Sequence, residues 1–200
     1  VWADPVAAKM MIGNLADGVR LFDRLTGEQL ITYTAMMFSV PREQIAPRVA
    51  DLLDLMDLRD AAGVIVADYS AGMTKKVALA CALVHAPRLL VLDEPFESVD
   101  PVSAANIEDV LRSYTATGGT VIVSSHSMDL VQRMCDHVAV IAAGRVRPVI
   151  GARMADAGIK DRLRKALTAL EAAFTDADPG RVYAATTRFY ETIFTSAGQD

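Results

Sequence analysis

Two adjacent carboxylates, Asp93 and Glu94, follow the apolar run "LLVL" and are themselves followed by a proline. Burying an unpaired carboxylate is costly, so such a pair is usually found where a metal, a cation or a reacting group meets it. At the end of a strand, the Asp can bind Mg²⁺ and the Glu can orient or deprotonate an attacking water. The alternatives for the two residues taken alone are a helix N-cap and a structural ion pair.

Ser70 stands at the start of the helical pattern "SAGMTKKVALACALVH" and is followed closely by Gly72. A hydroxyl and several backbone N–H groups at the start of a helix predict an anion site. The alternative is an ordinary N-cap with no ligand.

Three apolar runs rich in β-branched residues alternate with two helical patterns. The predicted strands lie at 89–94, 120–125 and 137–146, and the predicted helices at 102–116 and 127–135. This order predicts an α/β fold with a mostly parallel sheet. Ligands bind at the carboxyl ends of such strands, so we expect His126, which follows the second run, to lie on one edge with Asp93 and Glu94.

Helical patterns occupy the parts of the chain on either side of these strands. Apolar residues at three-to-four spacing predict helices in 30–58, with a break at Pro41, and in 71–85. Beyond Gly151 the chain is rich in Ala, Arg and Leu, which predicts further helices. We therefore expect a first domain at 1–152 and a C-terminal helical extension at 153–200.

The composition excludes several classes of protein. With 200 residues, 52% of them apolar, the chain can form one packed domain with an appendage. The net charge of −5 argues against a nucleic-acid-binding face, and no apolar stretch is long enough to cross a bilayer. The chain does not begin with Met, so we expect it to begin inside a longer sequence.

The motifs, in their order and spacing, resemble the nucleotide-binding domain of ABC transporters, particularly the ATPase subunits of drug-exporter-like systems. The resemblance covers residues 1 to about 150. "YSAGM" matches the signature motif, "LLVLDEP" Walker B, "SVD" the D-loop and "SSHSMD" the switch-histidine region. "IGNLADGVRLFDRLTGEQL" resembles the Q-loop and the entry to a helical subdomain, which we expect at about 20–68.

This resemblance implies a site that binds ATP with Mg²⁺ and hydrolyses it. By analogy with the family, Asp93 would help bind Mg²⁺ and Glu94 would polarise the attacking water. His126 would contact the γ-phosphate. Asp17 falls at the Q-loop position, where a Gln or Glu is usual, so it keeps an oxygen but has a shorter reach.

The resemblance also implies partners. The family hydrolyses ATP at a head-to-tail dimer interface, where Ser70 and Gly72 would face the ATP of a second nucleotide-binding domain and Asp100 would couple the two sites. A membrane permease would be the other partner, which implies a cytoplasmic location at the inner face of the membrane. The signature departs from the family pattern at Ala71 and Met73.

One family motif does not occur in the chain: no G-x-x-x-x-G-K-[ST] is present, and no Gly-Lys pair. Without this loop, nothing cradles the β-phosphate, and an apolar face of the sheet is expected to be uncovered. We therefore expect an N-terminally incomplete subunit of an exporter that is inactive on its own. The alternative is a non-enzymatic interaction protein.

The tail carries a second resemblance. Residues 157–200 resemble the opening helices of the effector-binding domain of GntR-type transcription regulators. Many members of that group bind a metal through an Asp and a His four residues later, and Thr186 and Tyr190 occupy those positions here, so no metal is expected. The alternative is a plain helical extension. A regulator is disfavoured by the acidic charge and by the lack of an identifiable helix-turn-helix.

Overall fold

The computed structural model describes residues 4–18, 20–142, 145–149, 165 and 168. Contacts divide the chain into two units, residues 1–126 and residues from 127 onward. The predicted boundary near 152 lies outside the described residues, and so do all but residues 165 and 168 of the predicted helical extension and of the segment that resembles GntR-type regulators. None of the helices in the described part is both long and apolar enough to span a membrane.

The first unit is built on a parallel sheet of three strands in the order β1-β2-β3. The strands are β1 (Ile12–Leu15), β2 (Leu89–Asp93) and β3 (Thr120–Ser124). Leu89 pairs with both Ile12 and Thr120, and Asp93 lies opposite Ser124 at the carboxyl end. The predicted α/β fold with a parallel sheet is therefore confirmed, while β1 was not predicted.

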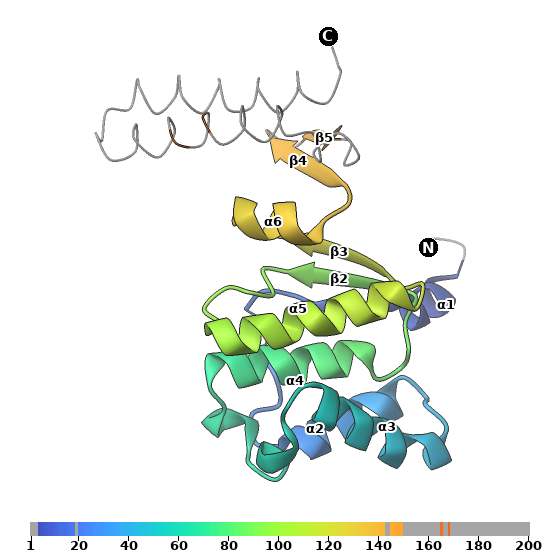
Figure 1. The fold of residues 1–200 in the computed structure, drawn as a ribbon. Coiled ribbons are helices and arrows are strands. Elements are labelled where there is room, and N and C mark those ends of the chain that lie inside the picture. The colour runs from blue at the N-terminus through green and yellow to red at the C-terminus, as the bar shows by residue number, and fades with distance from the viewer. Residues whose placement is uncertain (1–3, 19, 143–144, 150–164, 166–167, 169–200) are drawn as a thin grey trace. The chain divides into compact units, whose positions relative to one another are not determined.

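The helices that follow β1 in the first unit form two layers on one side of this sheet (Figure 1). The layer nearer the sheet contains α4 and α5, and α2 and α3 lie beyond α4. The helical elements are α1 (Pro5–Met10), α2 (Gly27–Met37), α3 (Arg42–Leu55), the short 3₁₀ helices Arg59–Ala61 and Val66–Asp68, α4 (Ala71–Leu83) and α5 (Pro101–Ala116).

The helix boundaries follow their capping residues. The predicted break at Pro41 is confirmed, because Pro41 precedes α3 and cannot donate a backbone hydrogen bond to a continuing helix. Asp100 caps α5, and Pro101 occupies the first turn, where its missing N–H costs nothing. The predicted helices at 71–85 and 102–116 agree with α4 and α5 within two residues at each end.

The two faces of the sheet differ in burial. One face packs on α4 and α5, and its core consists of Leu15, Leu90, Leu92, Val77, Leu79, Ile107 and Leu111. Gly13 permits the close approach of β1 to α4, since a Cβ there would lie 2.2 Å from the carbonyl oxygen of Ala82. On the other face Leu89 and Val91 are half-buried and Ile122 is 56% exposed.

The described part of the second unit contains α6 (Met128–Met134), β4 (Val138–Ala142) and β5 (Arg145–Val149). β4 and β5 pair antiparallel. The prediction of one strand over 137–146 is wrong, because the chain forms two strands there. An apolar run identifies β4, but β5 alternates Arg and Val and contains Pro148, so the same criterion does not detect it.

Candidate functional site

Asp93 and Ser124 are the last residues of two neighbouring strands, which places both at the carboxyl edge of the sheet. The Ser124 hydroxyl donates to Asp93 Oδ1 at 2.5 Å and accepts the N–H of Glu94 at 3.0 Å. One serine thus joins both residues of the carboxylate pair. It fixes the end of β2 to the end of β3.

Glu94 and His126 meet at the same edge. His126 Nδ1 lies 3.2 Å from Glu94 Oε2, and the two side chains are 77% and 24% exposed, respectively. The structure therefore brings Asp93, Glu94 and His126 together at one end of the sheet, as the strand pattern predicted. Their chemical roles stay predictions.

Asp17 is connected to this group through a lysine of α4. Lys75 Nζ lies 3.3 Å from Asp17 Oδ1 and donates to the carbonyl oxygen of Glu94 at 2.9 Å. The Lys75 side chain is only 18% exposed, so it crosses the interior between α4 and the sheet edge. Asp17 is therefore paired with a cation that also binds the Glu94 backbone.

Ser70, Gly72 and Asp100 form a second group, at the N-termini of α4 and α5. Ser70 Oγ accepts the N–H of Met73 at 3.2 Å, so Ser70 is the N-cap of α4. Gly72 is buried against α5, where a Cβ would lie 2.7 Å from Asp100 Oδ2 and 2.6 Å from Ser103 Oγ. The missing side chain of Gly72 is therefore what allows the two helices to meet.

The Asp100 carboxylate is hydrogen-bonded to the first turn of α5. Its Oδ1 accepts the N–H groups of Val102 at 3.0 Å and Ser103 at 2.9 Å. The hydrogen bond from the Ser103 backbone is the main reason why the pKa of Asp100 lies below its ordinary value. Asp100 is thus an ionised N-cap that also contacts the beginning of α4.

The side chains at the carboxyl edge of the sheet suit a metal ion that arrives bound to phosphates. In the described part of the chain, no three His, Cys, Asp or Glu side chains lie close enough to enclose a metal ion. Mg²⁺, however, commonly uses one or two carboxylates and completes its shell with water and substrate phosphates. The exposed carboxylate of Asp93 fits that requirement.

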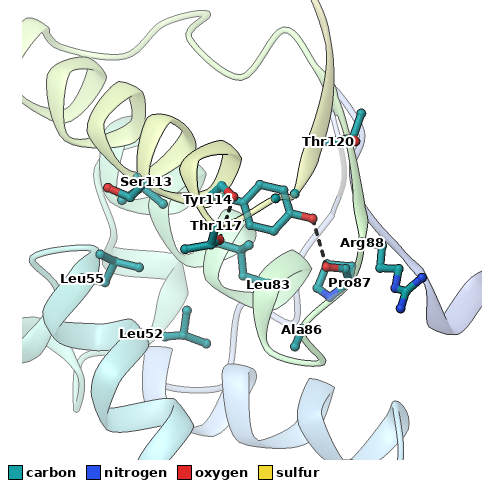
Figure 2. A pocket seen from close by; sticks show the side chains of 13 residues that line it. Leu52, Leu55, Leu83, Ala86, Pro87, Arg88, Ser113, Tyr114, Thr117 and Thr120 are labelled. Atoms are coloured by element: carbon teal, nitrogen blue, oxygen red, sulfur yellow. Dashed lines mark hydrogen bonds between the residues drawn. The ribbon is translucent and has the colours of Figure 1, made fainter.

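A cavity lies at the opposite end of the sheet. It has a volume of about 830 Å³ and is bounded by Arg88 before β2, by Thr120 at the start of β3 and by the end of α5. Figure 2 shows Tyr114 of α5 at this cavity, where its hydroxyl donates to the carbonyl oxygen of Pro87 at 3.0 Å. None of the predicted site residues lines it, and ligands of parallel sheets bind at the other ends of the strands.

A family model described as "AAA domain, putative AbiEii toxin, Type IV TA system" matches residues 17–132, which is more than half of the chain. The chain belongs to this AAA domain family. The match begins at Asp17 and extends past His126, so the AAA domain contains every predicted site residue. Membership of such a family implies nucleotide binding.

The relatives of this AAA domain are ABC transporter ATP-binding proteins, as the sequence resemblance implied. Nod factor export ATP-binding protein I of Sinorhizobium fredii is 35% identical over 150 residues, covering 72% of this chain and 44% of that protein. Methionine import ATP-binding protein MetN of Thermobifida fusca is 35% identical over 141 residues, covering 70% and 44%. This chain therefore spans less than half the length of both relatives.

A solved structure described as "Structure of ATP binding subunit of ABC transporter" has the same fold as this AAA domain. The TM-score is 0.66 at 26% identity, and the match covers 72% of this chain and 60% of that one. That structure and the relatives are thus of the same kind, ABC transporter ATP-binding proteins.

Two residues of the site were not predicted from the sequence. Lys75 lies in α4, which Ser70 caps, and Ser124 lies two residues before His126. The available signal was chemical: a lysine five residues after Ser70, and a hydroxyl residue in the last position of an apolar strand. Neither signal reveals which residue it contacts.

Proposed function

We propose that this chain forms the Walker B and signature part of an ABC transporter ATPase, and that the edge carrying Asp93, Glu94 and His126 hydrolyses ATP. The observation that supports this most strongly is the contact of 3.2 Å between Glu94 Oε2 and His126 Nδ1 at the carboxyl end of β2, beside Asp93. A carboxylate and an imidazole held together at that edge can act on a water and on a phosphate oxygen.

In this proposal Glu94 orients the attacking water and accepts its proton. One carboxylate oxygen contacts His126, and the other is directed to the water. The His126 ring is mostly exposed, so it can turn to donate to the γ-phosphate. Asp93 binds Mg²⁺ that arrives with ATP, and when bound the metal neutralises phosphate charge.

Ser70 and Gly72 would face the ATP of a second nucleotide-binding domain. The contact between Gly72 and Asp100 supports a role for Asp100 in coupling the two sites, because a shift of α5 would be passed directly to the start of α4. Asp17 would couple to the same site through Lys75. The other partner is a membrane permease, which would keep the ATPase at the inner face of the membrane.

The sequence resemblance implies export, and the Sinorhizobium relative is named for export. The Thermobifida relative is named for import. The proposal therefore concerns the ATPase step that exporters and importers share.

The test uses a chimera in which a segment carrying G-x-x-x-x-G-K-[ST] precedes residue 1, so that the β-phosphate has a cradle. Glu94→Gln in this chimera should keep nucleotide binding and slow hydrolysis by about 10² or more, because a water-orienting base is lost. The measurements are phosphate release and the dissociation constant for Mg·ATP.

The matched control is Glu97→Gln, which removes an exposed carboxylate from the same loop and should leave turnover unchanged. Equal turnover for the wild-type chimera and the Glu94→Gln variant would remove Glu94 from the chemistry and refute the proposal.

A further inference from the structure

Glu94 has a backbone conformation that its residue type and its neighbour both disfavour. Its φ angle is +44°, in the left-handed region, and the next residue is Pro95. Residues other than glycine seldom adopt a positive φ, and a following proline further disfavours helical conformations. Such strain persists only where surrounding contacts hold the residue in place.

Both backbone polar groups of Glu94 are bound by side chains from other elements. Ser124 Oγ at the end of β3 accepts the N–H at 3.0 Å, and Lys75 Nζ of α4 donates to the carbonyl oxygen at 2.9 Å. Within the loop, the N–H of Glu97 also donates to this carbonyl, at the longer distance of 3.2 Å. The peptide groups on both sides of the Glu94 Cα therefore have external partners.

The two external partners are themselves fixed. The ammonium group of Lys75 is paired with Asp17, and its side chain is largely buried, which limits the positions that Nζ can take. The hydroxyl hydrogen of Ser124 is directed to Asp93 Oδ1, so its lone pairs remain for the Glu94 N–H. A charged donor to a carbonyl is among the stronger hydrogen bonds, which suits Lys75 to oppose backbone strain.

We propose that Lys75 and Ser124 are positioning residues that hold the Glu94 backbone at positive φ and thereby orient its carboxylate toward His126. The chemical purpose of that orientation rests on the proposed function, while the positioning itself does not. The Cα–Cβ direction changes with φ, so a return of Glu94 to negative φ would turn the carboxylate away from its contact with His126.

The test is nuclear magnetic resonance spectroscopy of the 200-residue chain without nucleotide. A positive φ brings the amide proton and the α-proton of one residue closer together, so their intraresidue NOE is roughly fourfold stronger than at negative φ. The wild-type chain should show this strong NOE at Glu94. Lys75→Met and Ser124→Ala should each reduce it toward the value of ordinary strand residues.

Conservative replacements separate positioning from general stability. Lys75→Arg and Ser124→Thr keep the donor or acceptor and should retain the strong NOE. Lys9→Met and Ser113→Ala are controls, since Lys9 is exposed on α1 and Ser113 lies on α5 at the opposite end of the sheet. Both should leave the Glu94 signal unchanged.

A weak NOE at Glu94 in the wild-type chain would overturn the proposal. So would a strong NOE that survives both Lys75→Met and Ser124→Ala, because the Glu97 hydrogen bond would then suffice. If Lys75→Met does not fold, Ser124→Ala and Ser124→Thr still decide the matter through the same signal. The readout involves no ATP, so a chimera without hydrolysis would refute the proposed function and leave this result standing.

Discussion

Replacing Gly72 with alanine should destabilise the protein, because the new methyl group has no room. A Cβ at this position would lie 2.6 Å from Ser103 Oγ, 2.7 Å from Asp100 Oδ2 and 2.9 Å from Ser103 Cβ. The Ser103 Cβ cannot rotate away, since its position is set by the backbone of α5. The start of α4 must therefore move away from α5.

Overpacking of this kind costs about 1–3 kcal/mol. Alanine gains up to about 1 kcal/mol over glycine inside a helix, and less at position two of α4, where the helix is just beginning. We therefore expect a net loss of about 1–2 kcal/mol in the free energy of unfolding. Displacement of the Asp100 cap acts in the same direction.

Urea denaturation followed by far-ultraviolet circular dichroism measures this loss. For a slope of about 2 kcal/mol per molar, the midpoint should fall by about 0.5–1 M with the slope unchanged. The control is Gly63→Ala, where no atom lies within 4 Å of the added methyl group, and its effect should stay within about 0.5 kcal/mol. A Gly72→Ala midpoint equal to that of Gly63→Ala would refute the close contact between α4 and Asp100.

Two further predictions concern pH and nucleotide. Burial lowers the pKa of His85, so as the pH falls below about 6.5 the unfolded chain takes up a proton first and stability decreases. His85→Phe keeps the stacking on Phe38 and should flatten the dependence of the urea midpoint on pH between about 6.5 and 5; an unchanged slope would exclude His85 as its source. The 200-residue chain contains no G-x-x-x-x-G-K, so its dissociation constant for Mg·ATP should be about millimolar or weaker, which corresponds to a binding free energy of roughly 4 kcal/mol at most. A micromolar dissociation constant from isothermal titration would reveal a phosphate site elsewhere.

The sequence predicts β2, β3 and the start of α4 well because their signals are local. An apolar run defines each strand, and Ser70 caps its own helix. The strand Ile12–Leu15 is not predicted, because its four residues include Gly and Asn and show no clear alternation of apolar and polar side chains. Its position depends on the register with β2, which lies far along the chain.

The same difference between local signals and contacts of distant residues applies to the candidate site. Asp93 and Glu94 are neighbours in sequence, so their joint position follows from the end of one strand. The contact of Lys75 with Glu94 spans 19 residues, and that of Ser124 with Asp93 spans 31. The adjacent lysines of α4 illustrate the difficulty: Lys75 reaches the site, while Lys76 is buried and lies 3.8 Å from Asp57 Oδ2. Which lysine reaches the site depends on the rotation of the packed helix, which the pair "KK" does not specify.

We propose that nucleotide binds at the carboxyl edge of the sheet, beside Asp93 and Glu94. The most direct test adds Mn²⁺·ATP to the chimera, with Mn²⁺ in place of Mg²⁺, and records paramagnetic broadening of the backbone amide signals. We predict that the signals of Asp93, Glu94 and Ser124 broaden strongly, while those of Tyr114 and Thr117 at the opposite cavity stay sharp. Selective broadening at Tyr114 and Thr117, with sharp signals at Asp93 and Glu94, would show that nucleotide does not bind at the carboxyl edge.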